Sequence, residues 1–139
     1  MSVPVPKRSK NELQALQDTL EFVAYTIHMC ENEKIFPKKT RWTLCTRLID
    51  TCLDIVCNIR SANRINVQTK EQAELRTKLQ YDVLLDFEKV WGLLTIAEKT
   101  YPIPKEKINN VSSLLLKSED IVTNWRNSDI RKYKEQNFL

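Results

Sequence analysis

The sequence predicts an all-α protein, folded as an up-down-up-down antiparallel four-helix bundle. In four separate segments, apolar residues recur at alternating spacings of three and four, the period of a helix that packs on one side. Proline or polar breaks separate these segments, and long helices joined by short connections make neighbours antiparallel. The 139 residues include one glycine, against an average usage of about 7%. This scarcity argues against sheets and against a Gly-rich phosphate loop.

The first two helices are expected before residue 65. The first runs from about residue 10 to residue 33, with the apolar stripe Leu13, Leu16, Leu20, Val23, Ile27 and Cys30. Pro37 closes the following loop and can open the second helix, which carries the stripe Cys45, Leu48, Cys52, Ile55, Ile59 and Ala62.

The last two helices follow a polar break. Thr69 followed by Gln72 predicts a capping box at the start of a third helix over residues 70–100, with the stripe Leu79, Val83, Phe87, Val90, Leu94 and Ala97. Two prolines at 102 and 104 stop it. The fourth helix is expected over residues 105–127, with the stripe Ile108, Val111, Leu115, Ser118, Val122 and Trp125. The sequence thus predicts a flexible basic arm over residues 1–9, the bundle over residues 10–127 and a polar, frayed tail over residues 128–139.

Positive charge concentrates around the second helix. The stretch from Lys34 to Arg64 has seven basic residues against two acidic ones, Asp50 and Asp54, while the whole chain has a net charge of +4. One side of this helix packs and its ends and flank offer positive charge, which suits a polyanion partner, although an idle basic surface would look the same. Antiparallel packing brings the start of the third helix close to Arg60 and Arg64. The candidate nucleic-acid-binding residues are Lys38, Lys39, Arg41, Arg47, Arg60, Arg64, Arg76 and Lys78.

The third helix has a second, weaker apolar stripe, formed by Tyr81, Leu85, Gly92 and Ile96. A glycine inside a helix costs about 1 kcal/mol against alanine, and close approach of another backbone would compensate for it. We interpret this stripe as a contact between subunits; scattered surface hydrophobes are the alternative.

The sequence offers little for catalysis. His28 has no helical neighbour that would complete a metal pair, and neither a phosphate-binding loop nor a zinc spacing occurs. The four cysteines form no CxxC pair and fit small, reduced core residues, which predicts a cytoplasmic protein. No apolar run is long enough to span a membrane, and the first residues lack the apolar region of a signal peptide. We therefore expect no enzyme activity, no cofactor, no metal and no membrane partner.

The order of these features resembles a known family. It is carried by Phe36-Pro37-Lys38-Lys39, by residues 45–63, by residues 84–98 and by Ile121-Val122-Thr123-Asn124-Trp125. The pattern is similar to that of the accessory variability determinant (Avd) proteins of diversity-generating retroelements, and of the related four-helix bundle proteins of ribosomal RNA intervening sequences. The chain lacks the glycine that often precedes the terminal tryptophan. It also lacks the Asn-Ile-Ala-Glu-Gly type of ending of the second helix that marks many intervening-sequence proteins. This absence favours the retroelement branch.

The resemblance implies a ring-shaped homo-oligomer, a pentamer, that binds nucleic acid and the reverse transcriptase of the same retroelement. The pair would carry out mutagenic, template-primed cDNA synthesis from the template-repeat RNA, and the accessory protein would contact this RNA and DNA without an active site of its own. Two alternatives stay open: a helical protein–protein adaptor whose basic face is only solvated, and a bundle protein of the intervening-sequence type.

Overall fold

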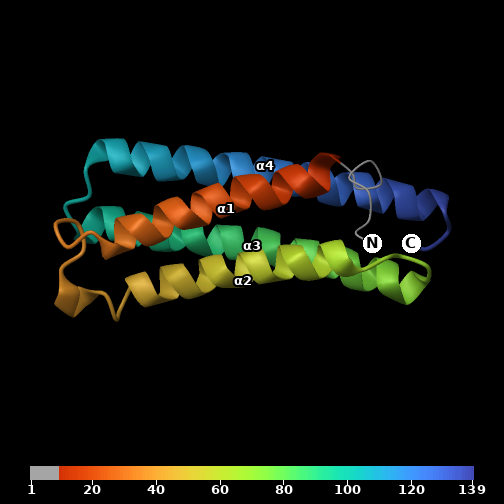
Figure 1. Ribbon diagram of the computed structural model, residues 1–139, viewed down its shortest axis with the longest axis horizontal. Helices are drawn as coiled ribbons and strands as arrows, with labels where there is room; N and C mark the ends of the chain where they lie inside the picture. Colours follow the sequence, from red (N-terminus) through yellow and green to blue (C-terminus); the bar gives the residue numbers. More distant parts are fainter. Residues whose placement is uncertain (1–9) are drawn as a thin grey trace, which may run out of the picture.

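A computed structural model describes residues 10–139 and contains four long α-helices (Figure 1). They are α1 (Lys10–Glu31), α2 (Cys45–Arg64), α3 (Lys70–Thr100) and α4 (Lys105–Glu135), and a short 3-10 helix, η2 (Lys38–Thr40), lies between α1 and α2. No strand occurs among the described residues. The expected basic arm over residues 1–9 lies outside them. None of the described helices is both long enough and apolar enough to cross a bilayer.

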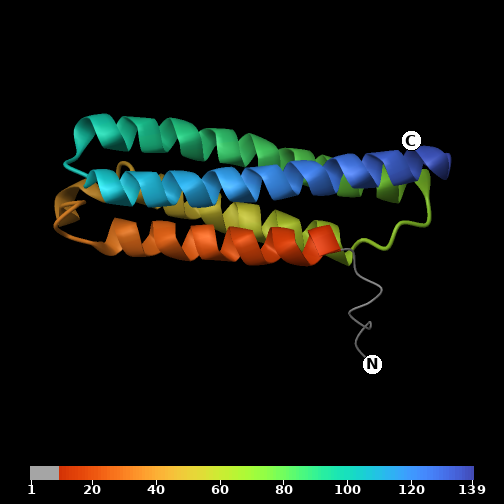
Figure 2. The ribbon, with the colours of Figure 1, turned by 90° about the horizontal axis from the view of Figure 1, so that it is seen from above.

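The four helices lie side by side along the long axis of the molecule (Figures 1 and 2). α1 packs against α2 and α4, and α3 packs against the same two helices. The connections between α1 and α2 and between α3 and α4 lie at one end of the bundle, which we call the α1–α2 end (Figure 1). The opposite end, called the α2–α3 end, holds the connection between α2 and α3 and the C-terminus of α4.

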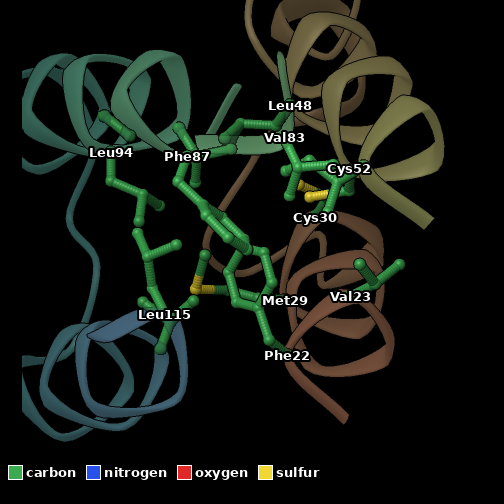
Figure 3. Close-up of a cluster of buried hydrophobic side chains, with 14 of the residues drawn as sticks. Phe22, Val23, Met29, Cys30, Leu48, Cys52, Val83, Phe87, Leu94 and Leu115 are labelled. Carbon is green, nitrogen blue, oxygen red and sulfur yellow. The ribbon is translucent and has the colours of Figure 1, made fainter. Parts of the chain in front are cut away.

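The apolar stripes predicted for three of the helices form the core. All six stripe residues of α2 are buried, and the stripes of α3 and α4 are buried except for their first members, Leu79 and Ile108, which are half-buried. The predicted capping box is present, because Thr69 Oγ1 accepts from the Gln72 backbone N–H at 3.2 Å and Gln72 Oε1 accepts from the Thr69 N–H. Figure 3 shows Leu48, Val83, Phe87 and Leu115 converging on the axis of the bundle.

The predicted stripe of α1 is only partly right. Val23 and Cys30 are buried, but Leu20 is 46% exposed, and α1 also buries a neighbouring row formed by Ala15, Thr19, Phe22, Thr26 and Met29. Both rows have helical spacing, so periodicity alone could not show which of them faces the core. The contact of Phe22 with α3 favours its row, because its ring packs edge-on against Phe87 with centroids 6.4 Å apart. Thr26 is tolerated in the core because its hydroxyl donates to the Phe22 carbonyl at 2.9 Å.

The expected end of the fourth helix at Asn127 is also wrong. α4 continues to Glu135, so residues 128–135 are helical rather than frayed. Asp129 and Tyr133 on this extension are buried. The extension lies beside the start of α3 and belongs to the packed bundle (Figure 2).

Candidate nucleic-acid interface

Exposed cations lie on the turn that leads into α2. Lys38 and Lys39 belong to η2, and Arg47 lies in the first turns of α2; all three side chains are exposed. The loop is anchored by the buried side chains of Ile35 and Phe36, and the Phe36 ring packs edge-on against Tyr101 at 5.1 Å. Among the described residues, no carboxylate forms an ion pair with these three cations.

Arg41, in the same loop, has a different role. Its Nη2 donates to the carbonyl oxygen of Glu31 at 3.1 Å and lies 3.7 Å from Glu33 Oε1. The guanidinium therefore closes the end of α1 against the entry to α2. Part of its charge is already engaged, so Arg41 contributes less to a phosphate site than the sequence predicted.

The α2–α3 end carries a second group of cations. Arg60 and Arg64 are exposed on the last two turns of α2, and within the described residues neither forms an ion pair. Lys78 is exposed too, but its Nζ lies 2.9 Å from Asp82 Oδ2. The extension of α4, expected from the sequence to be a frayed tail, adds the exposed side chains of Arg131, Lys132 and Lys134.

Arg76 is not part of this surface, and its assignment to it was wrong. The residue is 5% exposed and points into the bundle. Its Nε donates to Asp129 Oδ2 at 2.8 Å, its Nη2 donates to Glu12 Oε1, and its guanidinium lies 5.4 Å from the Trp125 ring centre. The packing of α3 on α2 does bring Arg76 to the end of α2, but from inside. Its charge is neutralised there and is not available to phosphates.

The Arg76 network joins all four helices. Nη1 of Arg76 donates to the backbone carbonyls of Ala62 and Ile65 at the C-terminus of α2, at 3.2 and 3.3 Å. Gln80 Nε2 donates to Asp129 Oδ2 at 2.7 Å. Burial alone would lower the pKa of the Arg76 guanidinium, but the carboxylates of Asp129 and Glu12 outweigh it, and the pKa is raised. Arg76 is a positive charge at every physiological pH.

The sequence does contain a signal for this network, because its residues continue the predicted stripes of α3 and α4 at helical spacing. Arg76, Gln80 and Val83 follow the spacing of four and three, so they continue the buried stripe of α3 toward its start. On α4, Asp129 follows Trp125 by four residues, and Tyr133 follows by four more. A basic residue and an acidic residue on two buried faces indicate an internal ion pair rather than a surface charge.

The middle of the bundle is acidic. Asp54 on α2 and Asp82 on α3 lie near Asp86, and burial, with added repulsion from these neighbours, raises the pKa of Asp86 although Lys89 opposes it. Glu119 on α4 accepts from the Trp91 indole N–H at 3.0 Å and lies beside Glu88. Burial raises the pKa of Glu119, and Glu88 adds to this effect. These residues form what we call the acidic middle, which lies between the two groups of cations.

The candidate subunit contact lies on the outer face of α3. Tyr81, Leu85 and Ile96 are 48%, 47% and 56% exposed, and a Cβ added to Gly92 would meet no described atom within 4 Å. The Arg126 guanidinium lies 5.2 Å from the Tyr81 ring centre and covers part of this residue. The predicted stripe is therefore an outward-facing apolar row, which the described helices leave uncovered apart from the contact of Arg126 with Tyr81.

The described residues offer no arrangement suited to metal binding. Over residues 10–139, no group of three or more His, Cys, Asp or Glu side chains is placed to hold a metal ion. His28 is exposed. All four cysteines are free; Cys30, Cys45 and Cys52 are buried and Cys57 is exposed. Burial raises the pKa of the Cys52 thiol to about 12 despite a contact with Thr26, so this cysteine is an unreactive core residue.

Comparison of the chain with models of known protein families, with curated proteins and with solved structures found no match. The functional assignment therefore depends on the charges and packing described above, together with the resemblance found in the sequence.

Proposed function

We propose that this protein is a nucleic-acid-binding accessory subunit that partners the reverse transcriptase of a diversity-generating retroelement. In this role it supports mutagenic, template-primed cDNA synthesis from the template-repeat RNA. The observation that supports nucleic-acid binding is the presence, at both ends of the bundle, of exposed cations that form no ion pair with the described residues. The enzyme partner is inferred from the resemblance to the Avd family.

The charge distribution supports contact with a polyanion at the ends of the bundle. Lys38, Lys39 and Arg47 form one group, and Arg60 and Arg64 form the other; each is free of internal carboxylate partners in the described part of the chain. A phosphate contact by an unpaired cation releases condensed counterions, whereas a cation already in an ion pair must first break it. The acidic middle repels phosphates and would keep them at the ends.

The oligomer is part of the same proposal. We take the unit to be an up-down-up-down bundle and the assembly to be a homopentameric ring, as the resemblance implies. The exposed row Tyr81, Leu85, Gly92 and Ile96 supports it, because an uncovered apolar row on a rigid helix suits a contact between copies. Repetition around a ring would also multiply the field of the basic ends.

A salt titration tests nucleic-acid binding. Arg60→Gln with Arg64→Gln should weaken binding of a structured RNA and of duplex DNA, and should reduce the slope of log affinity against log salt by about 0.7 to 0.9 for each phosphate that the variant no longer binds. Fluorescence anisotropy over a range of salt concentrations measures both quantities. Lys89→Gln with Lys117→Gln, the same change of charge in the acidic middle, is the matched control and should alter the slope little.

An unchanged affinity and slope in the Arg60/Arg64 variant would contradict the proposal for this end, and the same result for Lys38, Lys39 and Arg47 would contradict it for the other. Both results together would favour the adaptor, whose specific support is the exposed apolar row of α3. The enzymatic half of the proposal has its own readout, which is the cDNA made by a retroelement reverse transcriptase with the parent chain or with the Arg60/Arg64 variant.

A further inference from the structure

Trp42 is the most exposed large apolar side chain in the described part of the molecule, at 81%. A tryptophan in a well-packed bundle normally buries most of its area. Trp42 does not, although the loop that carries it is firmly held. Side chains close to it on both sides are fixed, because Arg41 binds the end of α1 and Leu44, two residues further on, is buried.

The backbone around Trp42 is also ordered by hydrogen bonds. The Arg41 N–H donates to the Lys38 carbonyl at 3.4 Å, and both the backbone N–H and the hydroxyl of Thr46 donate to the Arg41 carbonyl, at 3.0 and 3.3 Å. The indole is therefore presented to solvent from a fixed turn rather than from a loose loop.

An open groove lies against this indole. Its volume is about 600 Å³, within the range of small-ligand sites. Trp42, Leu44 and Arg47 line it from the α2 side, and Leu93, Ile96 and Tyr101 line it from the end of α3. Ile96 is also the last member of the exposed row proposed as the subunit contact, so the groove lies at the end of that row. Tyr101 is held in place by its edge-on contact with Phe36. The groove thus has an aromatic residue on each side, apolar residues beside them and one cation, Arg47.

The charges in and beside the groove indicate which kind of ligand fits it. No residue that lines the groove carries a carboxylate, and Arg47 is the charged one. Lys38 and Lys39 lie on the adjoining turn without a carboxylate partner among the described residues. A flat apolar group attached to a negatively charged backbone fits this combination, because the ring can stack on Trp42 while Arg47 and the lysines meet phosphates.

We propose that this groove binds an unpaired nucleobase of single-stranded nucleic acid, stacked on Trp42. The inference rests on the proposed function and deepens it, since it assigns the α1–α2 end to single strands. Base pairing hides both faces of a base inside the duplex stack, so a duplex could use the cations of this end but not the indole. The contact tolerates any base sequence because every base has a flat π-face.

The experiment compares two probes of equal length, a 20-nucleotide oligo(dT) and a mixed-sequence duplex, by fluorescence anisotropy. Trp42→Ala should weaken oligo(dT) binding about 5- to 150-fold, the range that one stacked base accounts for, and should leave duplex binding unchanged. Trp42→Phe should retain most of the affinity because it keeps an aromatic face. Leu53→Ala, which removes an exposed apolar side chain on α2 next to Asp54, is the matched control and should change neither affinity.

Intrinsic fluorescence gives a second measurement on the parent protein. Trp125 is buried and Trp91 half-buried, so stacking of oligo(dT) on Trp42 should quench the emission of the exposed indole. The Trp42→Phe variant should lose this quenching while it still binds. Binding of oligo(dT) without any such quenching in the parent would overturn the inference.

The outcomes separate this inference from the proposed function. If the parent binds neither probe, the proposed function fails and the inference fails with it. If the parent binds both probes and Trp42→Ala changes neither affinity, the inference fails and the proposed function stands. If Trp42→Ala instead weakens self-association or binding of the reverse transcriptase with nucleic-acid affinity unchanged, the groove is a protein contact and the inference is wrong.

Discussion

At the scale of single residues, Arg76 shows that the position of a charge matters more than its presence. It is enclosed by partners from α1, α2 and α4, which satisfy its nitrogens with two carboxylates and two backbone carbonyls. Such a network is tolerated in a core because every nitrogen of the guanidinium is paired. Removal of Arg76 leaves two carboxylates, Glu12 and Asp129, near each other without their cation.

We expect Arg76→Met to lower the free energy of unfolding by about 3 to 5 kcal/mol, the usual loss when one partner of a buried ion pair is removed. Urea denaturation measures this loss. Lys78→Met, two residues further along α3 and exposed, should cost less than about 1 kcal/mol because surface ion pairs contribute little. The folded Arg76→Met protein should bind nucleic acid with the parent's salt slope; a reduced slope would show that Arg76 contacts phosphate after all.

Asp86 is a residue whose charge opposes folding. It lies near Asp54 and Asp82, and burial together with these neighbours raises its pKa above the ordinary value. Between the ordinary pKa and the raised one, the folded chain binds more protons than the unfolded chain, so stability falls as pH rises through this window. Above the window the loss is complete.

We therefore expect Asp86→Asn to stabilise the protein at neutral pH by about 0.5 kcal/mol, the scale of a relieved like-charge pair on a helix. The gain should disappear below the ordinary aspartate pKa, where the carboxyl is neutral in both states. Thermal unfolding at a series of pH values tests this. Glu21→Gln, an exposed change of the same charge on α1, should show no such pH-dependent gain. Destabilisation by Asp86→Asn at pH 7 would mean that its ion pair with Lys89 outweighs the repulsion.

At the scale of elements, the buried face of a helix could be predicted from the sequence where the helix has a single periodic apolar row. α2 has one strong row, and all six of its predicted members are buried. α1 offers two rows, because Ala15, Thr19, Phe22 and Thr26 follow the helical period as well as the leucines do. The choice between them depends on tertiary contacts such as the one between Phe22 and Phe87, which the local pattern does not contain.

The ends of the helices were predictable where a local chemical signal exists. The capping box at Thr69 and the prolines near residue 103 set the bounds of α3 at Lys70 and Thr100, as expected. The C-terminal part of α4 lacks an apolar run, so its helical structure was not predictable from periodicity. It depends instead on the buried side chains of Asp129 and Tyr133, which pair with or lie near Arg76.

The sequence predicted that the candidate site is basic, but it did not predict which basic residues belong to it. Composition located the basic residues of α2, and all three of them, Arg47, Arg60 and Arg64, are exposed. Composition could not show that Arg41 closes a loop, because this depends on how the chain turns after α1. The spacing of Arg76 does place it on the buried stripe of α3, but its partners Glu12 and Asp129 come from distant parts of the sequence. The exposure of Trp42 was equally unpredictable, since a tryptophan in a helical protein is more often a core residue.

At the scale of the whole molecule, the bundle has two basic ends and an acidic middle, with one apolar row on the outside of α3. Two charged ends separated by acidic residues disfavour side-by-side contact with a polyanion along the full length of the helices. The row Tyr81, Leu85, Gly92 and Ile96 crosses the acidic middle and is the surface that we propose contacts another copy of the chain.

Substitutions at Gly92 test this assembly, because a side chain at this position should stabilise the folded chain but weaken the association of subunits. A Cβ added at Gly92 meets nothing within 4 Å in the single chain, so Gly92→Ala should stabilise the helix by up to about 1 kcal/mol. Gly92 is exposed, so we also expect the isolated chain to accommodate Gly92→Leu, whereas the larger side chain would prevent close approach of a second backbone. We expect Gly92→Leu to keep the parent's helicity by circular dichroism and to show a smaller mass by light scattering, whereas Glu98→Leu, on another exposed side of α3, should keep the parent's mass. A parent that scatters as a 16.4 kDa monomer at micromolar concentration would remove the ring from the proposal, and an oligomer unaffected by Gly92→Leu would place the contact on a different face.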